Sequence, residues 1–331
     1  MAVGDKMDGD MKKRKLWRSD LKVSCFCLGT AEFGASVSRE EAFGQMDIFW
    51  ANGGNFIDTA HIYNDWVEGE KARSEKIIGT WMRERRNRNQ VIISTKGGHP
   101  LLDTMSQSRA VPHEIRKDLE ESLKCLGTDM IDLYFLHRDN ERLPVYELLG
   151  VLEEARREGK IRYYGCSNWK LSRIKEAVQV ARENDFYGFM CNQAMWSLAS
   201  INEEKLSDQT LVVMDQATYK FQEEAKMNSM AYTSMAKGYF SKKLSQAEIS
   251  QSNVSVYGNE NNEHLTDYLK ILLKEGFSPL AVSMGYLMEQ RIPTIPIISF
   301  RNTDQLREAI EASSVILGEE RMERLNNLRE G

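Results

Sequence analysis

The chain has 331 residues, 41% of them hydrophobic, so it can bury a sizeable core in one large domain or two average ones. Its 44 basic and 49 acidic residues leave a formal net charge of -5, which argues against a nucleic-acid partner and favours a small-molecule ligand. The N-terminal segment is polar and charged, with no apolar stretch for a signal peptide or a membrane span. We therefore expect a cytoplasmic protein whose residues 1–15 form a disordered or loosely attached lead.

From residue 16 onward, short apolar runs alternate with amphipathic segments, which is typical of strands that alternate with helices. The runs predicted as strands are residues 25–30, 55–60, 91–97, 131–137, 161–168, 189–196, 228–235 and 292–299. The clearest helical patterns cover residues 42–50, 115–126, 145–158, 174–182 and 217–226. Residues 97–111 and 240–263 are predicted to be long loops, which in compact domains usually act as lids or binding loops or are disordered.

Strands that alternate with helices imply a parallel sheet. Eight of them predict an α/β fold, a single-domain (β/α)8 TIM barrel over residues 16–331. An open doubly wound sheet is the competing fold. It is disfavoured because the segment LGTAEFGAS after the first strand lacks the GxGxxG fingerprint of dinucleotide-binding sheets.

Four ionisable side chains stand at or just beyond the ends of three successive strands: Asp58, Tyr63, Lys96 and His137. The strand ends of a parallel barrel share one face, where active sites are built. A free phenol has a pKa of about 10, and a nearby ammonium favours its ionised form. Asp58, Lys96 and Tyr63 are therefore predicted to form a relay that tunes the phenol for proton transfer, and His137 is suited to orient a carbonyl or share the proton transfer.

These residues give the chain a resemblance to the aldo-keto reductases, which extends from Leu16 to the end. The stretches that carry it are GGNFIDTAHIYNDW, IISTKGG and IDLYFLHRDN. The resemblance implies a barrel oxidoreductase in which the tyrosine gives a proton while hydride arrives from a nicotinamide cofactor. It also implies that the Asp58–Lys96 pair lowers the pKa of Tyr63 and that His137 positions the carbonyl oxygen.

The resemblance further implies a set of cofactor-binding residues. GKIRYYGCSNW and CNQAMWSL point to contacts with the nicotinamide carboxamide and ring, and LGTAEFG points to the neighbouring ribose. AYTSMAKGYF corresponds to the pyrophosphate segment, and PTIPIISFRNTDQLREAI to the segment that binds the adenosine 2′-phosphate, so NADPH or NADP+ is expected, with NADH possible. The residues are Gly29, Thr30, Asp58, Ser167, Asn168, Gln193, Trp196, Thr233, Met235, Ala236, Lys237, Gly238, Ser299, Arg301, Asn302 and Gln305, with Trp196 as the aromatic that stacks on the nicotinamide.

The substrate is expected to contact Phe33, Trp66, His99 and Trp169, which flank these motifs. Flat aromatic faces beside hydrogen-bonding side chains favour a polar carbonyl such as an aldose, a keto-sugar or a hydroxy-aldehyde. The alternative is that Trp66 and Trp169 only pack under neighbouring loops. The sequence thus predicts an NADPH-dependent enzyme that reduces a carbonyl, or runs the reverse oxidation.

Three other functions remain open from the sequence. The first is a cofactor-binding regulatory or scaffold protein of the same fold. The second is a barrel lyase or isomerase that uses Lys96 to form a Schiff base. The third is a metal-dependent hydrolase, which is disfavoured because the sequence lacks clustered histidine and aspartate ligands, so no metal is expected.

Overall fold

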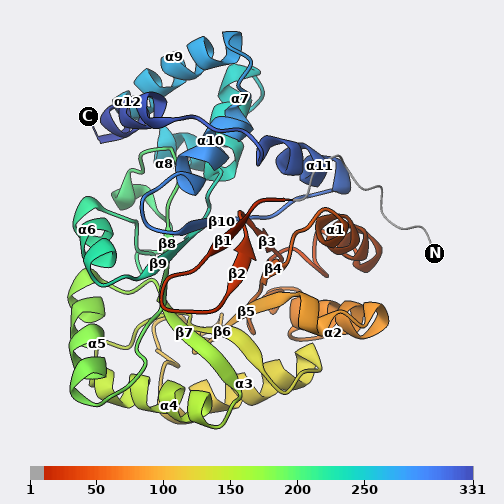
Figure 1. The fold of residues 1–331 in the computed structure, drawn as a ribbon, viewed down its shortest axis with the longest axis vertical. Helices are drawn as coiled ribbons and strands as arrows, with labels where there is room; N and C mark the ends of the chain where they lie inside the picture. Colours follow the sequence, from red (N-terminus) through yellow and green to blue (C-terminus); the bar gives the residue numbers. More distant parts are fainter. Residues whose placement is uncertain (1–10, 331) are drawn as a thin grey trace.

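The computed structural model describes residues 11–330, and residues 1–10 of the predicted lead lie outside them. Its centre is a closed barrel of eight parallel strands, which confirms the predicted (β/α)8 architecture (Figure 1). Each strand pairs with the next along the chain, and the last closes the ring on the first. The strands are β3 (Cys27–Gly29), β4 (Phe56–Asp58), β5 (Ile92–Gly97), β6 (Ile131–Leu136), β7 (Ile161–Ser167), β8 (Cys191–Met195), β9 (Asn228–Tyr232) and β10 (Thr294–Ile298).

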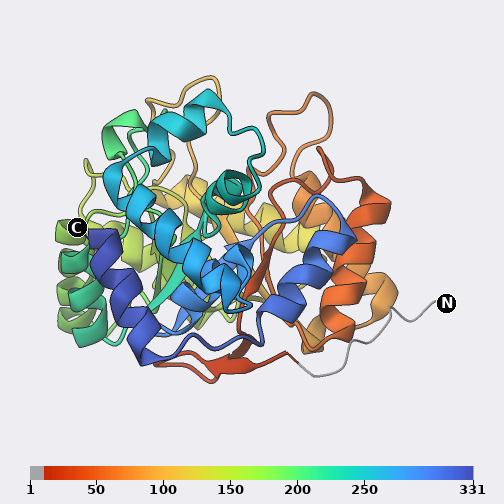
Figure 2. The ribbon, with the colours of Figure 1, turned by 90° about the horizontal axis from the view of Figure 1, so that it is seen from above.

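Helices surround the barrel and cover its outer face (Figures 1 and 2). They are α1 (Arg39–Ala51), α2 (Arg73–Arg85), α3 (Pro112–Leu126), α4 (Val145–Arg157), α5 (Leu171–Glu183), α6 (Gln216–Glu224), α7 (Tyr239–Leu244), α8 (Gln251–Tyr257), α9 (Glu260–Lys274), α10 (Pro279–Met288), α11 (Thr303–Ala312) and α12 (Glu319–Glu330). Short 3-10 helices occur at η1 (Arg88–Gln90), η2 (Glu203–Lys205) and η3 (Ala236–Gly238). None of the helices within residues 11–330 is long and apolar enough to cross a membrane.

Helix α3 illustrates why these segments are helical. Its buried apolar residues Ile115, Leu119, Leu123 and Leu126 recur every three or four positions, so they form one stripe that faces the core. The helix begins with Pro112, whose missing N–H costs nothing in the first turn. It ends at Gly127, where φ of +62° suits glycine in a left-handed cap.

A short N-terminal hairpin covers the end of the barrel where the strands begin, opposite their carboxyl ends. It consists of β1 (Lys13–Lys15) and β2 (Lys22–Ser24), which pair antiparallel, and Figure 2 shows it in red across one end. Leu16, Leu21 and Val23 of the hairpin are buried in one cluster with side chains of the barrel interior. Within the predicted lead, Lys13–Lys15 form strand β1 of this hairpin.

The segment 240–263 also differs from its prediction as a long loop. It contains most of α7, all of α8 and the start of α9. Ser250 and Asn259 accept hydrogen bonds from backbone N–H groups at the first turns of α8 and α9. The polar residues that suggested a loop are therefore partly helix caps, which is where serine and asparagine are favoured.

Gly165 on β7 permits a close approach between strands, and its replacement tests the barrel packing. An added Cβ would lie 2.4 Å from the carbonyl oxygen of Cys191 and 2.6 Å from the Phe135 ring. We expect Gly165→Ala to destabilise the fold by about 1–3 kcal/mol, because the backbone or the ring must move. Gly150→Ala is the control: in the middle of α4 an added Cβ meets nothing within 4 Å. It should stabilise the helix by about 0.5–1 kcal/mol. Thermal melting of both variants measures the effect, and an unchanged Gly165→Ala protein would contradict this packing.

Candidate active site

The four ionisable residues predicted from the strand ends converge at one end of the barrel. Asp58 is the last residue of β4, Lys96 lies near the end of β5 and His137 follows β6. Tyr63 lies in the loop after β4, with its ring centroid 6.1 Å from that of His137. They meet because parallel strands end on the same face of the barrel.

The buried Lys96 ammonium makes three contacts, one for each of its hydrogens. Its Nζ lies 2.7 Å from Asp58 Oδ2, 2.6 Å from the Thr59 carbonyl oxygen and 3.1 Å from the Tyr63 hydroxyl oxygen. An ammonium group only donates hydrogen bonds, so the Tyr63 oxygen is the acceptor in this contact. The proton of the Tyr63 hydroxyl is therefore directed away from Lys96.

Asp58 is held from the opposite side. Its Oδ1 accepts hydrogen bonds from the Ser94 hydroxyl at 2.7 Å and from Gln193 Nε2 at 3.1 Å. Both Asp58 and Lys96 are almost fully buried. Breaking a buried ion pair by removing one partner typically costs roughly 3–5 kcal/mol, so this pair is a rigid feature of the site.

The charge states of Tyr63 and Lys96 follow from burial and from each other. Burial raises the pKa of Tyr63, the Lys96 charge lowers it only in part, and the Asp58 charge raises it again, so the pKa lies above its ordinary value. Lys96 thus lowers the pKa of Tyr63, which is the direction expected for its charge, but burial outweighs this effect. Burial lowers the pKa of Lys96, but the Asp58 charge and the contact with Tyr63 outweigh it and raise the pKa. At neutral pH the site thus holds a charged lysine and a neutral phenol.

His137 and His99 are neutral neighbours, with ring centroids 4.6 Å apart. Burial, together with the charges of Arg138 and Lys96 and the presence of His99, lowers the pKa of His137 well below its ordinary value. Burial likewise lowers the pKa of His99 to about 4. His99 Nδ1 lies 2.7 Å from the Pro100 carbonyl oxygen, which can only accept, so Nδ1 carries the proton. Within residues 11–330, His137 Nδ1 has no hydrogen-bond partner.

Arg138 ties the long loop after β8 to the site. Its guanidinium contacts Asp208 at 3.2 Å, Thr210 at 3.1 Å and the His137 carbonyl oxygen at 2.9 Å. A pocket of about 630 Å3 opens beside it, with Met105 and Asn168 in its wall.

The residues predicted to bind the nicotinamide carboxamide lie beside this network. Asn168 follows Ser167 at the end of β7 and donates from Nδ2 to the Ser167 hydroxyl at 3.0 Å. Its Oδ1 accepts a hydrogen bond from the Tyr232 hydroxyl at 2.6 Å. Gln193 reaches Asp58 from β8. Gln193 thus contacts the Asp58–Lys96 pair directly, and Ser167 pairs with Gln193 in register between β7 and β8.

Trp196 does not lie at the site, so its predicted role as the stacking aromatic is wrong. It packs outside the barrel against Tyr219 of α6 and Tyr286 of α10, with ring centroids 5.7 and 6.4 Å away. The aromatic side chain beside Asn168 is instead Tyr232, the last residue of β9. A usable signal was present in the sequence, because Tyr232 follows Met230 by two positions and Met230 packs inside the barrel.

The segments predicted to bind the phosphates lie at or just beyond the ends of β9 and β10, and the segment predicted to approach the ribose lies at the end of β3. Thr233, Ala236, Lys237 and Gly238 have positive φ angles between +46° and +76°, which folds the chain into a tight turn with Met235. Within residues 11–330, the Lys237 side chain has no carboxylate partner in any ion pair. Its charge is therefore available to an anion.

Gly29 and Ser299 are adjacent, since a Cβ added to Gly29 would lie 2.6 Å from Ser299 Oγ. Thr30 is buried, and its hydroxyl donates to the Asp58 carbonyl oxygen at 2.9 Å, so the fold holds it in place.

Helix α11 begins just after the exposed Arg301. Asn302 caps the helix by accepting a hydrogen bond from the N–H of Gln305 at 3.0 Å. The Gln305 side chain in turn accepts from the N–H of Arg301 at 2.9 Å. Within residues 11–330 the Arg301 guanidinium has no ion-pair partner, and an arginine beside the start of a helix suits a phosphate group.

Two of the four predicted substrate residues are not accessible. Phe33 and Trp169 are buried in the core, where Trp169 packs against Phe189 with Arg173 over its ring. Both predictions are therefore wrong, and for Trp169 the packing alternative holds. Trp66 is 50% exposed, with its ring centroid 6.4 Å from that of Tyr63.

A model of the Aldo/keto reductase family matches residues 26–330 of the chain. The chain belongs to the aldo/keto reductase family. It is 30% identical over 329 residues to the uncharacterized oxidoreductase YrpG of Bacillus subtilis, covering 97% of both chains. It is 27% identical to norsolorinic acid reductase B of Aspergillus parasiticus, covering 94% of this chain and 82% of the relative. It is 26% identical to an aryl-alcohol dehydrogenase of Pestalotiopsis microspora, covering 90% of this chain and 77% of the relative.

This aldo/keto reductase is therefore a carbonyl-reducing oxidoreductase of a family that generally uses nicotinamide cofactors.

Proposed function

We propose that this aldo/keto reductase uses NADPH to reduce the carbonyl group of an aldehyde or ketone to an alcohol, with Tyr63 as the proton donor. The observation that carries the proposal is the 3.1 Å contact between Lys96 Nζ and the Tyr63 hydroxyl oxygen. Because Lys96 can only donate, the Tyr63 proton remains available to a substrate. The raised pKa keeps that proton on the phenol at neutral pH.

Reduction of a carbonyl requires hydride at its carbon and a proton at its oxygen, and a bound nicotinamide would supply the hydride. Tyr63 donates its proton to the developing alkoxide. The Lys96 ammonium then stabilises the phenolate left on Tyr63, and Asp58 keeps Lys96 in position. His137, as a neutral imidazole, has one N–H to offer to the carbonyl oxygen, which orients the substrate.

The residues that would hold the cofactor come from separate strand ends. Ser167, Asn168 and Gln193 offer hydrogen-bonding groups to the nicotinamide carboxamide, and Tyr232 offers a flat face to its ring. The turn with Lys237 would bind the pyrophosphate. Ser299, Arg301 and Asn302 would bind the 2′-phosphate at the start of α11, where an arginine and a helix N-terminus both favour a dianion.

For the substrate we favour an aromatic or largely apolar aldehyde or ketone over the sugar-like carbonyl expected from the sequence. Two aromatic side chains behind the earlier expectation, Phe33 and Trp169, are buried. Trp66 and Met105 remain partly exposed, at 50% and 39%, near Tyr63 and in the pocket wall respectively. Relatives named norsolorinic acid reductase and aryl-alcohol dehydrogenase support the same choice.

Two alternatives are less well supported. A regulatory protein of the same fold has no need for Asp58, Lys96 and Tyr63 to be joined in one buried network. A lyase that forms a Schiff base at Lys96 needs a neutral amine, whereas the raised pKa of Lys96 keeps it charged.

Removal of the Tyr63 hydroxyl tests the proton donor. We expect Tyr63→Phe to lose about 10²–10⁴-fold in turnover, because only the acid is lost. Cofactor affinity should stay within about twofold, since the ring is retained. Nicotinamide absorbance with an aromatic aldehyde measures turnover, and fluorescence titration measures cofactor binding. Tyr146→Phe, at an exposed position on α4, is the matched control. Near-full activity of Tyr63→Phe would refute the assignment.

Replacement of Arg301 tests the cofactor preference. Arg301→Ala should weaken NADPH binding by about 1.5–3 kcal/mol, because a charged hydrogen bond to the 2′-phosphate is lost. NADH lacks that phosphate, so its affinity should not change, and it serves as the internal control. Calorimetric titration of both cofactors measures the difference. Equal weakening of the two would mean that Arg301 only supports the start of α11.

A further inference from the structure

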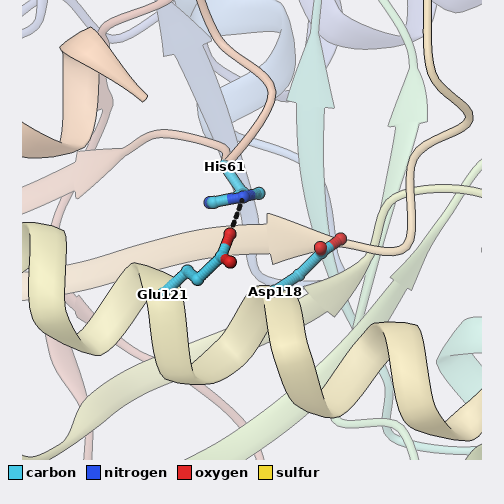
Figure 3. A group of neighbouring side chains, drawn as sticks. All are labelled: His61, Asp118 and Glu121. Carbon is cyan, nitrogen blue, oxygen red and sulfur yellow. Dashed lines mark ion pairs between the residues drawn. The ribbon is translucent and has the colours of Figure 1, made fainter. Parts of the chain in front are cut away.

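His61 lies two residues before Tyr63, and its side chain points towards the helices outside the barrel. Figure 3 shows the imidazole above Glu121 of α3. Nε2 lies 3.0 Å from Glu121 Oε2, and Nδ1 lies 3.4 Å from Oε2 of Glu75 on α2. We call these two contacts the His61 bridge. They join the loop that carries Tyr63 to both α2 and α3.

The geometry of the bridge fixes the protonation of His61. A neutral imidazole has one N–H donor and one lone pair, whereas a carboxylate can only accept. Both ring nitrogens face carboxylate oxygens, so both must carry a proton for both contacts to be favourable. Glu75 cannot turn away, because it is fully buried and its Oε1 accepts a hydrogen bond from Thr95 at 2.6 Å.

The surrounding charges support the imidazolium form. Burial lowers the pKa of His61, but the hydrogen bond and charge of Glu75 and the charges of Asp118 and Glu121 outweigh it and raise the pKa. Other charged or titratable side chains line the same pocket. They are Arg39 on α1, Asp65, Glu70 and Lys71 in the loop before α2, Arg73, Lys76 and Arg83 on α2, Arg109 before α3, and Lys117, Lys124 and Cys125 on α3. Burial raises the pKa of Cys125 to about 11, so this thiol is uncharged.

A metal ion explains the cluster less well. His61, Asp118 and Glu121 place ligand atoms within 4.8 Å of one another. However, Asp118 Oδ1 lies 2.6 Å from Arg109, and Oδ2 accepts the N–H of Gly98 at 2.9 Å. His61 and Glu121 alone are too few ligands for a structural zinc site.

The bridge adds to other contacts that hold the same segment. Besides the contact of Tyr63 with Lys96, Asn64 donates from Nδ2 to the Phe33 carbonyl oxygen, and Asp65 Oδ1 accepts the N–H of Ala72 at 3.0 Å. The N–H of His61 donates to the Lys96 carbonyl oxygen at 3.0 Å, and that of Tyr63 to the Ala60 carbonyl oxygen at 3.1 Å. Helices α2 and α3 form a firm base, since a Cβ on Gly79 would lie 2.4 Å from the Cys125 carbonyl oxygen. A side-chain link to this base limits how far the Tyr63 loop can move.

We propose that doubly protonated His61 is a positioning residue, which fixes the Tyr63 hydroxyl by tying its loop to Glu75 and Glu121. This inference rests on the proposed role of Tyr63 as proton donor. The bridge is complete below the pKa of His61 in the folded protein, which lies above its ordinary value. It loses one contact as the pH rises through that pKa.

The first test is the pH dependence of kcat and of the NADPH dissociation constant, measured with an aromatic aldehyde. In the wild type, kcat should fall as His61 deprotonates, at lower pH than any ionisation of Tyr63. His61→Gln should reduce kcat by about 10- to 100-fold at pH 6, because a displaced acid reacts poorly. It should also abolish this pH dependence and leave the NADPH dissociation constant unchanged.

Two variants of exposed residues provide a matched pair in case His61→Gln does not fold. Glu121→Gln removes one partner of the bridge and should move the fall in kcat to lower pH. Glu120 is the neighbouring residue on α3 and pairs with Lys160, so Glu120→Gln should not change the pH at which kcat falls. The proposal is overturned if His61→Gln keeps the wild-type pH dependence, if both glutamate variants behave alike, or if His61→Gln weakens cofactor binding as much as kcat.

The second test does not need turnover. NMR titration of the His61 imidazole, assigned with His61→Gln, should give a pKa above the ordinary value of about 6.5, and Glu121→Gln should lower it. The amide hydrogen exchange rate of residues 61–66, corrected for the intrinsic effect of pH on exchange, should increase in the wild type when the pH exceeds that pKa. Because neither measurement requires turnover, both test the bridge independently of the proposed function. The proposed function fails separately if the protein reduces no carbonyl. The proposal is overturned if the pKa of His61 lies at or below the ordinary value, or if the exchange rate does not change as the pH passes through that pKa.

Discussion

Lys96 and Asp58 bring opposite charges together where almost no water reaches them, and the other polar groups of the site are arranged around that pair. Ser94 and Gln193 donate hydrogen bonds to the second carboxylate oxygen of Asp58, and the Lys96 ammonium donates one of its three hydrogens to the Tyr63 hydroxyl oxygen. Because each hydrogen of the Lys96 ammonium already has an acceptor and the Tyr63 oxygen is one of them, the Tyr63 hydroxyl must direct its own proton away from Lys96. The site is thus preorganised before any substrate arrives, which is the condition for electrostatic catalysis.

The barrel makes this arrangement possible by bringing distant strand ends together while the opposite end is closed. Parallel pairing in chain order places Asp58 beside Ser94, and Lys96 beside Phe135, in register. The N-terminal hairpin fills the other end with Leu16, Leu21 and Val23. Stability and chemistry are therefore divided between the two ends, as is usual for this architecture. The His61 bridge adds a side-chain link between the loop that carries Tyr63 and the outer helices α2 and α3.

The sequence was sufficient for the barrel and for the four ionisable residues of the site, because each of them lies at or just beyond the end of an apolar run that predicts a strand. It failed where the direction of a side chain mattered. Trp196 was assigned to the site from the family resemblance, and Phe33 and Trp169 from their position beside motifs, but all three side chains pack in the core or the outer layer. Tyr232 was missed for the same reason, although its alternation with Met230 contained the answer. The helices within 240–263 were missed because their capping residues have the composition of a loop.

The state of Tyr63 is the central claim, since a proton donor must hold its proton at working pH. The most direct measurement is the ultraviolet absorbance of tyrosinate across a pH titration, taken as the difference between the wild type and Tyr63→Phe. The other tyrosines cancel in this difference. Because burial outweighs the effect of Lys96 on the pKa, the difference should show no tyrosinate below about pH 10, the ordinary value for a phenol. A tyrosinate signal from Tyr63 near neutral pH would contradict the account.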